Sequence, residues 1–177
     1  MKYINTIILI TIIILLHFVV HELAHAVAAK LLGYDVIMGL NIVALDNQVY
    51  ASRTDAMIVS IAGPVVTFLI ALTAAIVSHK RQSIVAFWIV LTATFQRILA
   101  QIVSLGNPND EMRVSIDLGV GDWTLPGFSI ALFVILSIWA WQGPKPKPLL
   151  FFIAWIGMSI GFSMAVFGDR ILPKIYW

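Results

Sequence analysis

The chain has 177 residues, of which 60% are hydrophobic and 11% are charged, and its net charge is +2. A water-soluble domain usually carries about 25% charged residues, so this chain lacks the polar surface that water on all sides requires. Its scattered basic residues form no concentrated basic face, which argues against nucleic-acid binding. The absence of cysteine excludes disulfides and thiolate metal sites. The composition predicts an integral membrane protein whose solvent is the lipid bilayer.

The first apolar segment covers about residues 3–32. Its unbroken apolar stretch, Tyr3 to Val20, is longer than the roughly 7–15 residues of a signal-peptide core, and no small-residue cleavage region follows. The helical pattern continues to residue 32, where Gly33 is a typical C-terminal stop. We therefore expect a retained transmembrane helix.

The segment between residues 34 and 53 differs in kind, because it carries β-branched residues around a central turn signal, Asp46-Asn47. This pattern predicts a small hairpin at about residues 35–52, with strands at about Asp35–Ala44 and Gln48–Ser52. Two interpretations are open. The hairpin is either an ordinary surface feature or an edge strand that pairs with an extended substrate.

Four further apolar segments, each near the roughly 20 residues that span a bilayer, cover about residues 56–79, 83–105, 126–141 and 148–167. The proline-rich stretch Gly143–Pro148 predicts an exposed turn between the last two. No internal repeat or domain boundary is evident. We therefore expect one domain over residues 1–177, an all-α polytopic membrane protein with about five transmembrane helices and a small β-hairpin.

The motif His21-Glu22-Leu23-Ala24-His25 lies in the second half of the first predicted helix. Histidines four residues apart share one helix face, so both imidazoles can bind one zinc ion. Glu22 can act as the general base toward the attacking water. Polar groups at this depth in a bilayer are costly, which favours a functional site. The alternative is a set of buried groups that satisfy one another by hydrogen bonds.

His17 precedes this motif by one helical turn on the same face. It could support a metal ligand, substitute for one or shuttle protons. We favour the simpler interpretation, a helix histidine bonded to a neighbouring backbone or side-chain group, and do not include His17 among the predicted ligands.

A catalytic zinc site commonly has three protein ligands and one open position. The third predicted helix returns to the membrane side of the motif just before Asp110, so Asp110 is the favoured third ligand. Glu111 and Asp117 are alternatives. Asp35 and Asp55 lie on the same side, but loop carboxylates are more often solvated. A plain loop or helix-capping role for Asp110 is the competing interpretation.

Three motifs together resemble the site-2 protease family of intramembrane metallopeptidases. They are the His-Glu-x-x-His of the first helix, Gly63-Pro64 in the second, and Asn107-Pro108-Asn109-Asp110 after the third. The resemblance covers about Tyr3 to Leu118. It implies one catalytic zinc ion, with His21, His25 and Asp110 as ligands and Glu22 as catalytic base. The hairpin resembles the family's membrane-associated β region, which is implicated in substrate presentation.

The chain departs from the family pattern at two positions. The family often has Asp-Gly where this chain has Asp110-Glu111, and it often has Asn where this chain has Thr67. We expect a minimal catalytic core without the PDZ or CBS domains that many members carry.

Three other features each have two interpretations. Gly63-Pro64 could mark a helix kink or a site of close helix packing. Asn107 could donate a hydrogen bond to the substrate or to a transition-state oxyanion, which makes it a predicted catalytic residue, or it could cap a turn. Arg97 and Gln101, four residues apart, are expected to form an interior polar pair.

These observations predict an intramembrane zinc metalloprotease that cleaves transmembrane proteins or peptides. A substrate helix would first unwind, since its carbonyls are held in hydrogen bonds, and the hairpin would then hold it extended. The alternatives are a membrane metal transporter or sensor and an inactive relative that binds membrane partners. A homo-oligomer is left open.

Charge does not decide the orientation, because five Lys or Arg residues fall on each side of the predicted spans. The family resemblance suggests that the active site lies nearer the cytosol and the N-terminus outside. The expected location is the plasma membrane of a prokaryote.

Overall fold

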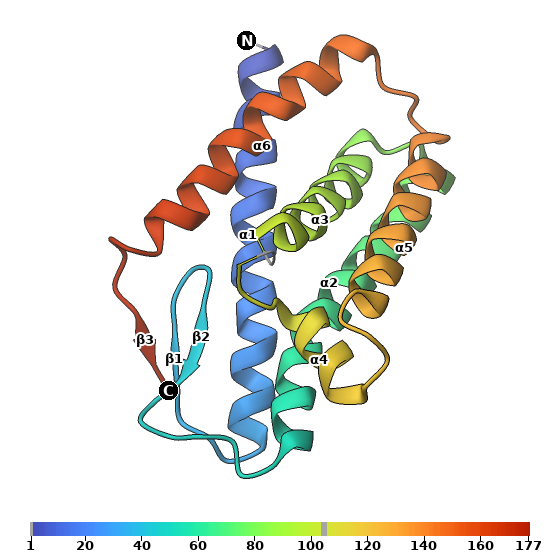
Figure 1. Ribbon diagram of the computed structural model, residues 1–177. Coiled ribbons are helices and arrows are strands. Elements are labelled where there is room, and N and C mark those ends of the chain that lie inside the picture. Colours follow the sequence, from blue (N-terminus) through green and yellow to red (C-terminus); the bar gives the residue numbers. More distant parts are fainter. Residues whose placement is uncertain (1, 104–105) are drawn as a thin grey trace.

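The computed structural model describes residues 2–103 and 106–177, and within them the chain forms six helices and three short strands (Figure 1). Five helices are long and apolar enough to cross a membrane, which confirms the predicted fold class. The predicted third segment extends over residues 104 and 105, which lie outside the described residues. In chain order the elements are α1 (Lys2–Leu31), β1 (Val36–Met38), β2 (Val43–Leu45), α2 (Arg53–Arg81), α3 (Ile84–Val103), α4 (Asp110–Leu118), α5 (Thr124–Trp141), α6 (Pro148–Gly168) and β3 (Ile175–Tyr176).

Helix α1 forms the centre of the molecule, with α6 packed along it and α2 against another side. Two glycines of α6 allow the close approach. A Cβ atom at Gly157 would lie 2.9 Å from the carbonyl oxygen of Ile7, and one at Gly161 would lie 3.0 Å from the Cβ of Ile14. Small residues commonly mediate such contacts between membrane helices. The α1–α6 pair is thus built on backbone proximity.

Helix α3 packs against α2 and α5, and the largest buried side chains of this region are Trp88, Phe87 and Phe133. The outer faces of the helices carry exposed apolar side chains instead, for example Phe128 of α5 and Phe152 of α6. An exposed apolar surface of this extent suits contact with lipid rather than water.

The predicted hairpin exists, but its turn lies at Gly39–Ile42 and the predicted turn at Asp46-Asn47 is wrong. The Gly39 N–H donates to the Ile42 carbonyl oxygen at 2.8 Å, and β1 pairs with β2 in antiparallel register with Ile37 opposite Ala44. Residues 48–52 form no strand; Asn47 has a left-handed φ of 53° as the chain leaves β2. The strand order is β2-β1-β3, because the C-terminal residues pair with the other edge of β1.

Helix α4 was not among the predicted elements. Its N-cap is Asn109, whose side chain accepts a hydrogen bond from the Met112 N–H at 2.9 Å, and its C-cap is Gly119 with φ 68°. These are ordinary capping contacts for a short helix. Asp110 therefore lies in the first turn of a helix rather than in a loop.

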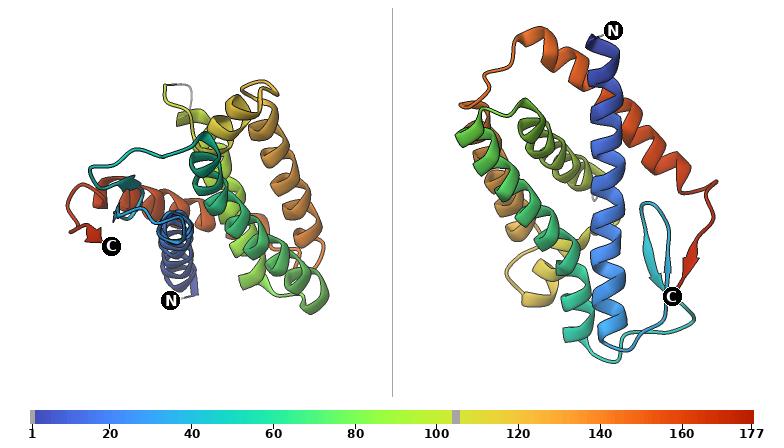
Figure 2. Two further views of the ribbon diagram at one scale, coloured as in Figure 1. Left: turned by 90° about the horizontal axis from the view of Figure 1, so that it is seen from below. Right: turned by 180° about the vertical axis from the view of Figure 1, so that it is seen from behind.

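Two further views show that the sheet lies on one side of the C-terminal half of α1, while α2 and α4 lie on the other (Figure 2). The half of α1 that carries the motif is thus enclosed between the sheet and the helices.

Candidate metal centre

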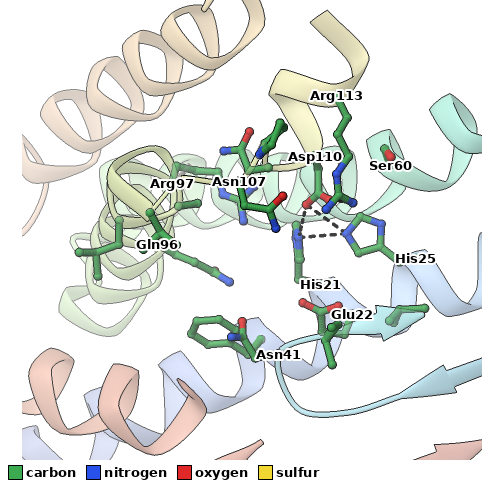
Figure 3. A pocket seen from close by; sticks show the side chains of 18 of the residues that line it. His21, Glu22, His25, Asn41, Ser60, Gln96, Arg97, Asn107, Asp110 and Arg113 are labelled. Carbon is green, nitrogen blue, oxygen red and sulfur yellow. Dashed lines mark hydrogen bonds and ion pairs between the residues drawn. The ribbon is translucent and has the colours of Figure 1, made fainter. Parts of the chain in front are cut away.

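His21 and His25 lie on one face of α1 and are both buried, with exposed fractions of 3% and 6%. Their Nε2 atoms are 3.1 Å apart. One oxygen of Asp110, Oδ2, lies 3.1 Å from Nε2 of His21 and 3.3 Å from Nε2 of His25 (Figure 3). The three atoms form a nearly equilateral triangle, and these residues could hold a metal ion.

The size of this triangle can be compared with a tetrahedral zinc site. Bonds of about 2.0–2.1 Å to nitrogen and oxygen place tetrahedral ligand atoms about 3.3–3.4 Å apart. The observed separations of 3.1–3.3 Å are within a few tenths of an ångström of that spacing. Three protein ligands also leave the fourth tetrahedral position open, as catalytic zinc sites do. The donor set therefore fits zinc.

Hydrogen bonds from the other ring nitrogens orient both imidazoles. His25 Nδ1 donates to the Val59 carbonyl oxygen at 2.6 Å. The Thr67 hydroxyl donates to the Gly63 carbonyl oxygen at 2.9 Å, so its oxygen accepts from His21 Nδ1, 3.0 Å away. With the proton on Nδ1 in each ring, the Nε2 lone pairs of both histidines point to the centre of the triangle.

Gly63 allows the backbone of α2 to lie against these two rings. A Cβ atom at this position would be 2.4 Å from Nε2 of His25 and 2.6 Å from Cε1 of His21, closer than any real contact. Pro64 follows and has no N–H, so the Ser60 carbonyl loses its helical donor. Gly63-Pro64 is thus part of the site and a point of close helix packing.

The other candidate carboxylates have different partners. Glu111 is buried and pairs with Arg97 at 2.9 Å, and Asp117 pairs with Arg53 at 2.6 Å. Asp55 accepts a hydrogen bond from the Tyr34 hydroxyl at 2.6 Å, and Asp35 pairs with Lys30 at 2.7 Å. Among the described residues, only Asp110 joins the two histidines.

The expected polar pair of Arg97 with Gln101 is not formed among the described residues, because the Arg97 guanidinium turns to Glu111 instead. The Ser129 hydroxyl donates to the same Glu111 oxygen at 3.2 Å. The Glu111 side chain therefore ties α4 to α3 and to α5, one residue from Asp110. Glu111 therefore has a structural role beside the candidate ligand.

The charge of Asp110 is favoured by its surroundings. Burial alone would raise the pKa of this carboxyl, but a proton on Nε2 of His21 or His25 makes the contact with Asp110 favourable and holds the pKa well below its ordinary value. A bound metal ion would take the place of that proton beside the same carboxylate oxygen. The N-terminus of α4 adds a favourable helix dipole. An ionised carboxylate is the form that binds metal.

Glu22 is 7% exposed and lies beside the two histidines in Figure 3. It forms no hydrogen bond with the described residues, in contrast to Asp110 and Glu111. Its carboxylate lines a cavity of about 620 Å³ that also reaches the three candidate ligands. A buried carboxylate without a fixed partner is free to accept a proton at this cavity.

The cavity is lined by residues of α1, α2, α3, α4, α6 and the hairpin. Asn107 lines it, as its predicted catalytic role requires, although its side chain is otherwise exposed. The other lining residues include the polar side chains of Asn41, Gln96 and Arg97. They also include the apolar side chains of Ile42, Val43, Phe162 and Val166.

His17 does not line this cavity. Its Nδ1 lies 3.3 Å from the Thr92 hydroxyl of α3, and Thr92 donates to the Trp88 carbonyl oxygen. This arrangement agrees with the simpler interpretation of His17 as a helix histidine bonded to a neighbour.

No protein-family model, curated protein or solved structure matches this chain. The site is therefore interpreted from its own geometry.

We predict that Gly63→Ala weakens zinc binding about 100-fold or more, because the added methyl group must displace both imidazoles. Titration of the purified metal-free protein with zinc measures the effect. The matched control is Gly127→Ala in α5, where a Cβ atom meets nothing within 4 Å. Equal zinc affinity in Gly63→Ala and the unaltered protein would contradict the close approach of α2.

We also predict that Thr67→Val weakens zinc binding about 10–100-fold, since His21 loses the acceptor for its Nδ1 proton. Thr67→Ser should retain most of the affinity. Thr73→Val is the control, because Thr73 makes the same bond to the carbonyl four residues earlier and is exposed. A loss of affinity as large in Thr73→Val would show that the effect is not specific to His21.

Proposed function

We propose that this protein is an intramembrane zinc metalloprotease that hydrolyses peptide bonds of membrane-protein substrates. The observation that carries the proposal is the triangle of His21, His25 and Asp110, with the carboxylate of Glu22 in the same cavity and without a hydrogen bond to the described part of the chain. Metal-dependent hydrolysis needs metal ligands and a base, and two histidines with a carboxylate can supply the ligands while an adjacent glutamate supplies the base. The resemblance to site-2 proteases supports the same function.

The chemistry divides between the metal and the residues of the chain. Zinc held by the triangle would supply a Lewis acid for the scissile carbonyl. Glu22 accepts a proton from the attacking water and passes it to the leaving amine, so that water is added across the C–N bond. The Asn107 side chain lines the cavity and can donate a hydrogen bond to the substrate carbonyl.

The free edge of β2 supports the binding of an extended substrate. Gly39 pairs with Ile42 and Asp35 with Asp46 through hydrogen bonds, so by strand alternation the backbone groups of Val43 and Leu45 point away from β1. Neither N–H has a partner among the described residues. Val43 also lines the cavity. An unwound substrate segment could therefore add to this edge beside the candidate ligands.

The rival functions fit less well. A metal transporter or sensor would need metal-binding side chains along a path through several helices, and α5 and α6 contain no His, Asp or Glu. An inactive relative would not need the buried Glu22. The five spans make this a multi-pass membrane protein, and we propose the plasma membrane of a prokaryote, with the site nearer the cytosol.

We predict that Glu22→Gln keeps zinc but lowers cleavage by roughly 10²–10⁴-fold, since the amide retains the shape of the side chain and cannot accept the proton. Cleavage of co-expressed candidate membrane substrates and the zinc content of the purified protein are measured together. Asp110→Asn, by contrast, should lose zinc. Cleavage by Glu22→Gln at the full rate would contradict the assignment of the base.

We further predict that Val43→Pro lowers kcat/KM about threefold to tenfold at unchanged zinc content, because proline removes an N–H on the free edge of β2. The hairpin itself should persist, since this N–H does not pair with β1. Val49→Pro, at a position that is 85% exposed and outside the strands, is the control. An unchanged kcat/KM in Val43→Pro would exclude substrate pairing through this residue.

A further inference from the structure

Asp169 immediately follows the last residue of α6, and its side chain reaches the turn of the hairpin. The Leu40 N–H donates to Asp169 Oδ1 at 2.7 Å, and the Asn41 N–H donates to the same oxygen at 3.2 Å. The Asp169 side chain is only 15% exposed. A carboxylate that accepts two successive backbone N–H groups makes strong, charge-assisted hydrogen bonds.

The turn is shaped around this carboxylate. A Cβ atom at Gly39 would lie 2.1 Å from Asp169 Oδ1, so only glycine lets the turn close on the oxygen. The ammonium of Lys174 lies 3.6 Å from the other carboxylate oxygen and is 40% exposed. The backbone contacts are therefore the main partners of Asp169, and Lys174 is a peripheral one.

The segment around Asp169 is itself held at two places. Before it, α6 is packed on α1 through Gly157 and Gly161. After it, β3 pairs with β1, where Trp177 N–H donates to the Val36 carbonyl oxygen at 3.0 Å. Figure 1 shows the hairpin turn and the end of α6 on the same side of α1. Asp169 thus joins the turn to a fixed helix.

The same elements form one wall of the cavity. Asn41 and Ile42 of the turn, Val43 of β2, and Phe162 and Val166 of α6 all line it. A displacement of the turn would move the free edge of β2 relative to the histidines of α1. The position of that edge therefore depends on the contact between Asp169 and the turn.

We propose that Asp169 is a positioning residue that fixes the hairpin turn and thereby sets the distance between the free edge of β2 and the metal centre. It acts on substrate alignment and takes no part in the chemistry. The substrate part of this inference rests on the proposed proteolytic function. The contact between Asp169 and the hairpin turn, which we call the tether, does not rest on that function.

The kinetic test compares Asp169→Ala with Asp169→Asn and Lys174→Met. Asp169→Ala is expected to raise KM about tenfold, with kcat changed less than about twofold and zinc content unchanged. Asp169→Asn keeps an oxygen acceptor and should recover part of the loss. Lys174→Met should behave like the unaltered protein. An unchanged KM in Asp169→Ala, or equal losses of kcat and bound zinc, would overturn the positioning role.

A second test needs no substrate. Because the chain has no cysteine, a spin label can be attached at Ile42→Cys alone, a position that is 45% exposed. We expect the label to be immobilised when residue 169 is Asp and clearly more mobile in Asp169→Ala. Its mobility in Asp169→Asn should lie between the two. A label at Val49→Cys should not respond.

The two tests separate the two claims. Equal mobility at residue 42 with Asp169 and with Asp169→Ala overturns the tether, whatever the activity. Increased mobility of the label in Asp169→Ala supports the tether. If the unaltered protein at the same time cleaves no candidate substrate, the tether stands and the proposed function is contradicted.

Discussion

At residue 63 the backbone of α2 lies against the imidazoles of His21 and His25, at a distance that leaves no room for a side chain. The same approach brings the Val59 carbonyl and the Thr67 hydroxyl to the outer nitrogens of the two rings. Ring orientation, tautomer and ligand spacing therefore all follow from one helix contact. Had α2 been farther from α1, the rings would lose their acceptors and the Nε2 atoms would not converge.

The third corner of the triangle depends on a different kind of contact. Asp110 begins the short helix α4, and its neighbour Glu111 anchors that helix through the buried pair with Arg97. Removal of one partner from such a pair typically costs about 3–5 kcal/mol, because the other charge is left buried. The pair therefore opposes any movement of α4 that would carry Asp110 away from the histidines. A polar anchor of this type suits a membrane protein, because burial of apolar surface drives little association between helices in lipid.

Much of this arrangement follows from the sequence. The five spans are evident from length and hydrophobicity, and the passage of three helices across a bilayer brings residue 110 to the same side as residues 21–25. The grouping of these side chains could therefore be anticipated from a motif and a count of crossings. The metal itself and the reaction stay predictions.

Other parts of the site depend on contacts that no local pattern reveals. Asp46-Asn47 has the composition of a turn, but the hairpin closes at Gly39–Ile42, where Asp169 from the far end of the chain accepts two N–H groups. Strand β3 has two residues, too few for a periodic signal. Thr67 donates to a carbonyl of its own helix, as a threonine in a helix commonly does. Its second role, as the acceptor for His21 Nδ1, depends on the packing of α2 against α1.

The alternation of backbone groups along β2 has a consequence for where a bound chain could be cut. Only every second residue of β2 presents its N–H and carbonyl groups to the free edge. If a paired strand shifts along this edge, its hydrogen bonds form again, with its side chains on their original faces, only after a shift of two residues. If the proposed pairing holds, alternative cleavage positions within one substrate would keep a constant parity, so that the products differ in length by even numbers of residues.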